Sequence, residues 1–192
     1  MPTLLAEATS PTAWSVSAPT AAKAMQVAYV RLDGKQALLQ LQPMKDLGTI
    51  TVPWDPSVFQ GSGNEPRKTI SFSIPDVVRE QMELIEEAIR DKLRESIPDI
   101  DSIWSSATKP PGKHQSLLRA KIVVAGDKAC ACFNAAGEPA PLPEEWRGLP
   151  VVPILAIKSV YLQKAMAGIV LEVTSLMIGE PTQQGVERGG FL

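Results

Sequence analysis

The chain has 192 residues, enough for one domain and too few for two full ones. Its hydrophobic fraction of 44% and charged fraction of 21% are ordinary for a globular protein, which excludes wholesale disorder. The net charge of −2 is unlike the strongly basic balance of duplex-binding modules.

The first 22 residues are rich in Ala, Ser, Thr and Pro, with an isolated Trp14. This composition offers little apolar surface to offset the entropy lost on ordering, so we expect residues 1–22 to form a flexible arm. The segment lacks the basic start and continuous apolar run of a secretory signal. No run in the chain approaches the ~18 apolar residues that cross a bilayer, so we expect an intracellular protein, in nucleus or cytoplasm.

Alternating apolar residues then predict a series of short strands. These cover residues 25–29, 37–41, 49–54 and 69–74. Asp33-Gly34 is a tight-turn signal between the first two, so we expect them to form a hairpin. In the third strand, Ile50, Val52 and Trp54 should share one face because side chains alternate along a strand.

One amphipathic helix follows. Its apolar stripe has spacings of four, three, four and four, and consists of Val78, Met82, Ile85, Ile89 and Leu93. Ser73 or Asp76 could cap its start, and Pro98 should mark its end. Its other face is rich in Glu, which predicts a solvated surface, with an acidic docking surface as the alternative.

Two pairs of apolar, β-branched segments close the pattern. Leu117–Val124 and Ala129–Phe133 flank a Gly126-Asp127 turn, and Val152–Leu162 precedes Gly168–Ile178. Each pair is expected to form a hairpin. The chain is therefore expected to be a β-rich α+β protein built on an antiparallel barrel, with an N-terminal hairpin and one amphipathic helix.

The residue types that support catalysis or metal binding are scarce. The single histidine, His114, lies in a Pro/Gly-rich loop, where rigid positioning for a nucleophilic mechanism is difficult. Cys130 and Cys132 are two apart on a predicted strand, too few ligands for a structural zinc site and badly placed for a disulfide bond. Glycine-rich phosphate motifs are absent. We expect no enzyme activity, no metal and no cofactor.

A binding surface is better supported. Lys109 and Lys113 lie in the basic loop, and Arg119 and Lys121 have the same parity on the following strand, so they should extend from one sheet face. Three further residues complete the candidate nucleic-acid site: Trp104, Tyr161 and Lys164. Together they supply cations for a backbone and aromatic rings for bases. Alternatively, the aromatics are packing residues and the strand lysines protect a sheet edge.

At these residues the chain resembles the OB-fold single-stranded-DNA-binding proteins of large nucleocytoplasmic DNA viruses. The similar motifs are Ser102-Ile-Trp104, the loop 109–113, Leu118-Arg-Ala-Lys-Ile122, a turn at Gly137, and the strand segments 153–161 and 168–173. The resemblance covers roughly residues 49–179. It implies an OB-like barrel, which we expect to occupy residues 23–179, and a function in coating exposed single strands, of DNA in such proteins, during replication or repair. It implies DNA contacts at Trp104, Lys109, Lys113, Arg119, Lys121 and Tyr161, and a viral replication site if the chain is viral.

A second class of function stays open at this point. A structural or assembly protein, such as a virion or scaffold component, could use the same barrel and oligomerise by exchanging its terminal arms. The arms would be residues 1–22 and a flexible C-terminal tail, residues 180–192, which ends in the apolar pair Phe191-Leu192. A homo-oligomer formed through these arms is also compatible with strand coating. A protein that binds single-stranded nucleic acid needs its cations on one face of the sheet, whereas the cations of a scaffold protein can be scattered over the surface.

Overall fold

The computed structural model describes residues 2–22, 25–41, 48–58, 66–111 and 115–179. Its strands are β1 (Thr3–Leu4), β2 (Trp14–Val16), β3 (Thr20–Ala22), β4 (Met25–Leu32), β5 (Lys35–Gln40), β6 (Arg67–Ile74), β7 (Thr108–Lys109), β8 (Ser116–Val123), β9 (Ala131–Phe133), β10 (Val151–Gln163) and β11 (Met166–Ile178). Its helices are α1 (Asp76–Leu93) and α2 (Ile100–Ile103), with the 3-10 turns η1 (Leu5–Thr9) and η2 (Pro11–Ala13).

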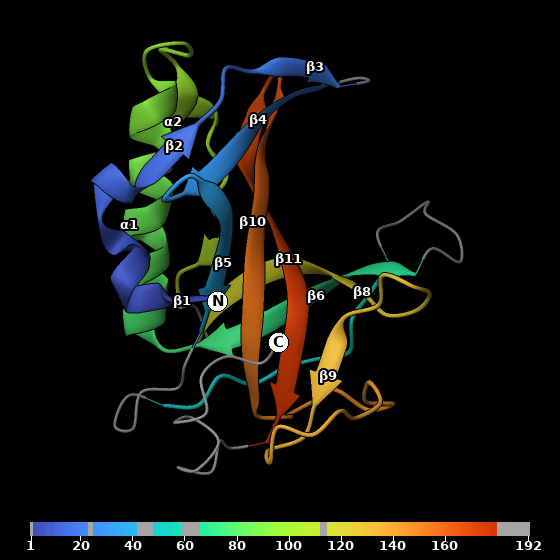
Figure 1. Ribbon diagram of the computed structural model, residues 1–192. Helices are drawn as coiled ribbons and strands as arrows, with labels where there is room; N and C mark the ends of the chain where they lie inside the picture. The colour runs from blue at the N-terminus through green and yellow to red at the C-terminus, as the bar shows by residue number, and fades with distance from the viewer. Residues whose placement is uncertain (1, 23–24, 42–47, 59–65, 112–114, 180–192) are drawn as a thin grey trace.

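The long hairpin β10–β11 is the spine of the sheet, and it runs through the middle of the molecule (Figure 1). Strand β10 pairs with β4 and β5, while β11 pairs with β8 and β9 on its other edge. The prediction of this hairpin is confirmed, with a tighter turn than expected, because Gln163 already pairs with Met166.

The sheet is strand-rich, mixed and not closed into a barrel, which corrects the expected antiparallel barrel while remaining consistent with an OB-like architecture. Strands β8 and β9 both run parallel to β11, and β1 runs parallel to β5. Alternation in a sequence marks which residues face inward, but it carries no information about the direction of the partner strand.

Two predicted hairpins have different outcomes. The β4–β5 hairpin is confirmed, and Asp33 and Gly34 adopt the positive φ values, 49° and 74°, that a tight hairpin turn needs. The prediction of a hairpin between β8 and β9 is wrong. After the turn at Gly126, the Cys130 N–H still reaches the Val123 carbonyl, but β9 then pairs with β11 instead.

The prediction of a strand over residues 49–54 is also wrong, because only Thr51 of this segment forms β-bridges, one to Ser73 and one to Pro150. Ile50 and Val52 are buried as expected, whereas Trp54 is 45% exposed. Pro53 and Pro56 flank Trp54 and lack the N–H groups that would continue a ladder.

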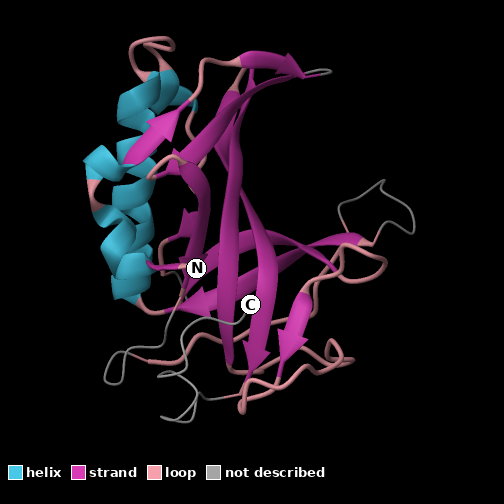
Figure 2. Cartoon of the chain, viewed as in Figure 1, coloured by secondary structure: helices cyan, strands magenta, loops and turns pink. Residues whose placement is uncertain are grey.

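Helix α1 lies along one side of the sheet (Figure 2). Its predicted apolar stripe is confirmed: Val78, Met82, Ile85, Ile89 and Leu93 are all buried. The helix ends at Leu93, before Pro98, and neither expected cap bonds to its first turn. Instead, the Asp76 carboxylate accepts a hydrogen bond from the Ser116 hydroxyl, which ties the helix start to β8.

The N-terminal segment, expected to be a flexible arm, packs onto this helix. Its side chains Leu5, Ala8 and Trp14 are buried, and the Trp14 indole N–H donates to the Ala8 carbonyl at 2.8 Å. These few apolar groups suffice because η1 contacts α1 directly and adds a second layer to it. The expected C-terminal tail, residues 180–192, lies outside the described residues. Within the described ranges, no helix combines the length and apolarity needed to span a membrane.

Candidate functional site

Strands β6, β8 and β11 bury alternate side chains, among them Ile70, Ala120 and Leu171. The residues between them point the opposite way, and we call that side of the sheet the outer face. Register shows which residues meet there. Thr69 of β6 lies beside Lys121 of β8, which lies beside Glu172 of β11.

Three of the predicted cations share this outer face. Arg119 has the same parity as Lys121 on β8, and Lys109 of β7 is paired with Leu117, which also has that parity. Arg119 and Lys109 are exposed, while Lys121 is half-buried. The fourth predicted cation of this group, Lys113, lies outside the described residues.

Lys121 is held in place by its neighbour. Its ammonium group donates to the Thr69 hydroxyl at 2.8 Å. Partial burial, and then the positive charge of Arg67, lowers the pKa of Lys121.

Two further cations on this face share one carboxylate. Arg67 and Lys158 both pair with Glu172, at 3.2 and 3.3 Å. Lys158 reaches it from a bulge in β10 between Ile157 and Ser159. Counting Lys109, Arg119 and Lys121, five cations face one carboxylate on these described strands.

Tyrosines continue the outer face across the hairpin. Tyr161 pairs with Gly168, and Tyr29 of β4 pairs with Ser159, with 58% of Tyr29 exposed. A Cβ at Gly168 would lie 2.6 Å from the Ser105 carbonyl oxygen and 2.9 Å from the Tyr161 hydroxyl. Only glycine therefore fits beneath the Tyr161 side chain. Tyr29 was missed as a site residue, although its alternation with Met25 and Val27 had placed it on a strand.

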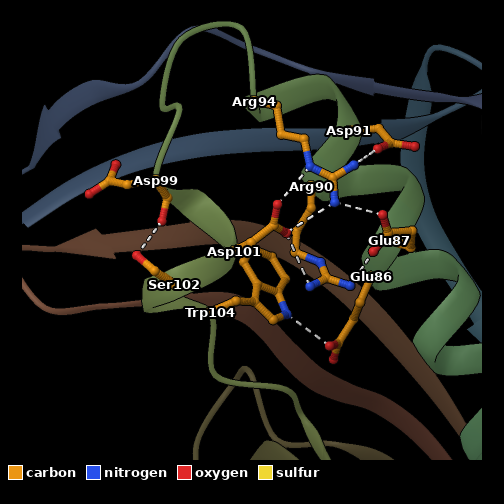
Figure 3. Close-up of polar contacts among 9 residues, drawn as sticks. All are labelled: Glu86, Glu87, Arg90, Asp91, Arg94, Asp99, Asp101, Ser102 and Trp104. Atoms are coloured by element: carbon orange, nitrogen blue, oxygen red, sulfur yellow. Dashed lines mark hydrogen bonds and ion pairs between the residues drawn. The ribbon is translucent and has the colours of Figure 1, made fainter.

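Trp104 does not share the outer face with the lysines, contrary to expectation. It bridges to the fully buried Ala167, whose neighbour Gly168 faces outward. Its indole N–H donates to the buried Glu86 carboxylate at 2.9 Å, and the Arg90 guanidinium lies 5.7 Å from its ring centroid (Figure 3). The ring is thereby committed to packing between α1 and the sheet.

Lys164 is also separate from the other cations. It is exposed in the turn at the tip of the β10–β11 hairpin. Glu172 is roughly 20 Å away along β11, at ~3.3 Å per residue. Lys164 borders a shallow hollow with Asp99, Ile97 and Met25 rather than the row of lysines.

The acidic face of α1 is largely paired with arginines. Arg94 bonds with Glu87, Asp91 and Asp101, and Arg90 bonds with Glu87 and Asp101 (Figure 3). The hydrogen bond from Arg94 lowers the pKa of the Asp101 carboxyl. This network fits the solvated surface predicted from the sequence.

Glu86 is the unexpected member of the buried stripe of α1, with 2% exposure. Besides Trp104, its carboxylate accepts the Ala107 backbone N–H at 2.8 Å, just before β7. Burial is the main cause that raises the pKa of Glu86 above its ordinary value of 4.5, and these hydrogen bonds oppose the rise. Sequence periodicity alone could not separate Glu86 from its solvated neighbours.

The raised pKa of Glu86 predicts a pH-dependent stability. As pH rises above 4.5, the unfolded chain releases this proton before the folded chain does, so the free energy of unfolding falls until the folded-state pKa is passed. Glu86→Gln carries no such proton. The difference in unfolding free energy between wild type and Glu86→Gln, measured by urea titration across this range, should therefore decline with pH. A difference that is constant with pH would contradict the assignment.

The described residues contain no group of three or more His, Cys, Asp or Glu side chains that could hold a metal ion. Cys130 and Cys132 are buried free thiols, and burial raises the pKa of Cys130 to about 12. The sole histidine, His114, lies outside the described residues.

Comparisons with known proteins identify the fold. No family model and no curated protein matches the chain. Among solved structures, the single-stranded DNA-binding protein gp2.5 of bacteriophage T7 is similar, with a TM-score of 0.51 and 14% identity over 82% of this chain and 98% of that one. The single-stranded DNA-binding protein of bacteriophage Enc34, in complex with single-stranded DNA, has a TM-score of 0.47 and 13% identity over 88% and 97%.

At this level of identity the likeness to the T7 protein establishes a shared fold. The expected likeness to single-stranded-DNA-binding proteins is supported as to fold, while the T7 protein comes from a bacteriophage and shows no link to large nucleocytoplasmic DNA viruses.

Proposed function

We propose that this protein binds single-stranded DNA with little sequence preference, and that the strand lies across the outer face. The observation that carries the proposal is the placement of Lys109, Arg119 and Lys121 on one side of the sheet. The T7 protein, whose fold the chain shares, is a single-stranded DNA-binding protein, which supports the same activity here.

The chemistry of the face suits a flexible polyanion. Exposed Lys109 and Arg119 can contact phosphates, and each contact releases condensed counterions. Glu172 offsets part of the charge of Arg67 and Lys158 and fixes both side chains near the centre of the face. This moderates affinity, because these two cations are partly neutralised before any phosphate binds.

Tyr161 and Tyr29 supply stacking surfaces beyond the cations. A base stacked on an aromatic ring contributes ~1–3 kcal/mol and is accepted whatever its identity. Both tyrosines lie on a pleated sheet surface rather than on a helix or ribbon shaped for the major groove, which favours unpaired bases over duplex. Coating of strands during replication or repair, inside a cell and without catalysis, is the role that this binding would serve.

Fluorescence anisotropy with a labelled dT oligonucleotide tests the proposal. Three phosphate contacts give a logarithmic salt slope of about −2, so affinity should fall roughly 20-fold between about 0.05 and 0.2 M salt. Duplex of the same length should bind more weakly. Absence of binding at both salt concentrations, or an affinity that does not change with salt, would refute single-strand binding by this face.

The alternative of an assembly protein that exchanges its arms is less well supported. In the described N-terminal residues, Leu5 and Trp14 are buried within the chain's own core. Exchange would first have to break those contacts.

A further inference from the structure

A groove of about 600 Å³ opens beside the row of cations, and nothing argued so far uses it. Its lining residues are Thr51, Pro53, Trp54, Ser73, Gln115, Leu117 and Arg147. Ser73 and Leu117 are paired across β6 and β8, one outward-facing step from the Ser71–Arg119 pair. The groove is therefore continuous with the outer face.

Trp54 lies on one wall of the groove, in an arch formed by residues 52–56 beside the edge strand β6. Thr51 exchanges two backbone hydrogen bonds with Ser73, and Ser57 exchanges two with Thr69. Between these two pairs lie five residues of the edge segment, 52–56, but only three residues of β6, 70–72. The two extra residues make the edge segment bulge away from the sheet. Pro53 and Pro56 lie in this arch, so it loses few ladder bonds.

Hydrogen bonds to residues 146–149 hold the arch in place, so the groove has a defined shape. The Val52 N–H donates to the Leu149 carbonyl, and the Gly148 N–H donates back to Val52 at 2.7 Å. The Asp55 carboxylate accepts the Trp146 N–H at 3.0 Å. Arg147 lies between these anchor points, so Trp54 and Arg147 are both held at the rim of one groove.

We propose that this groove holds one unpaired nucleobase of the bound strand, stacked on the Trp54 indole, with Arg147 beside the adjoining phosphate. The inference rests on the proposed function and names a subsite within it. Three features favour this occupant: the groove is continuous with the face that carries Arg119, the Trp54 indole is half-exposed, and the Arg147 cation lines the same groove. The Ser73 hydroxyl, which donates to the Gln115 amide oxygen at 2.8 Å, adds polar groups for a base edge.

Tryptophan fluorescence can report this subsite directly. Trp14 and Trp146 are 2% and 6% exposed, and the Trp104 indole N–H is bonded to Glu86. Trp54, at 45%, is the tryptophan that a base can reach. Saturating dT oligonucleotide should quench the emission of wild type, and Trp54→Phe should remove most of that quenching while largely keeping affinity.

Affinity supplies the second readout. Trp54→Ala should weaken binding about tenfold or more, the loss expected for one stacked base. Leu84→Ala, which truncates an exposed apolar residue on α1, should leave binding unchanged. Replacing dT by a strand of abasic sites should reduce the quenching. If Trp54→Ala unfolds, Arg147→Gln and the wild-type quenching still test the groove.

The outcomes separate the two proposals. Wild type that binds the oligonucleotide with no change in tryptophan emission, or Trp54→Ala that binds as tightly as wild type, overturns the base subsite and leaves single-strand binding standing. Wild type that fails to bind at either salt concentration overturns both.

Discussion

Neutralising the two exposed cations of the outer face, as Lys109→Gln/Arg119→Gln, should weaken binding to a dT oligonucleotide roughly 20-fold at about 0.1 M salt. Each lost phosphate contact removes about 0.7 from the logarithmic salt slope, so the slope itself should drop by about 1.4. Both side chains are exposed, so the substitutions should leave folding intact. Anisotropy titrations at several salt concentrations measure affinity and slope together.

The matched control is Lys35→Gln/Lys92→Gln, which changes the net charge by the same amount. Lys92 is exposed on α1, and Lys35 pairs with the buried Leu32, on the side of the sheet opposite Tyr29 and Arg31. This variant should keep nearly full affinity. Equal losses in the two variants would mean that overall charge, and not the outer face, governs binding.

Glu86→Ala should destabilise the fold by roughly 3 kcal/mol. It leaves two donors without their acceptor, the Trp104 indole N–H and the Ala107 backbone N–H, in a place where water has little access. For a chain of this size the loss corresponds to a fall in Tm of roughly 10 °C. Thermal and urea unfolding measure it.

Two variants calibrate this effect. Glu83→Ala removes a carboxylate from the same helix that pairs with Arg79 near the surface, and it should cost well under about 1 kcal/mol. Glu86→Gln keeps one carbonyl acceptor and should fall between the two. Should Glu86→Ala unfold like Glu83→Ala, the hydrogen bonds to Trp104 and Ala107 would not be important for stability.

The helix and the strongest strands could be predicted because each has a clear period. The spacing of Met82, Ile85 and Ile89 fixes the buried stripe of α1, and alternation fixes Ile70 and Phe72 as core residues of β6. The partner of each strand could not be predicted in this way. Strands β8 and β9 both pair with β11 in parallel, which requires a long connection back to the far end of the sheet. No local sequence pattern encodes the path of such a connection.

Part of the candidate site could be predicted from the alternation of side chains along a strand. Arg119 and Lys121 are two apart on a strand, so their common face was readable, and the register adds Lys109. The aromatic residues were harder to place. Trp104 and Trp54 are both isolated in the sequence, yet one packs against a buried Glu86 and the other is raised on a proline-flanked arch. Burial of a single aromatic residue depends on tertiary contacts that no short pattern encodes.

Photochemical cross-linking tests the central claim most directly, because it locates the strand on the protein. An oligonucleotide carrying 5-bromodeoxyuridine in place of thymidine would be irradiated in complex with the full chain, and the modified peptides identified by mass spectrometry. We predict cross-links in peptides of the outer face, at Tyr161 and Tyr29, and at Trp54 in the adjoining groove. Cross-links confined to the exposed side of α1, around Leu84, would contradict the account.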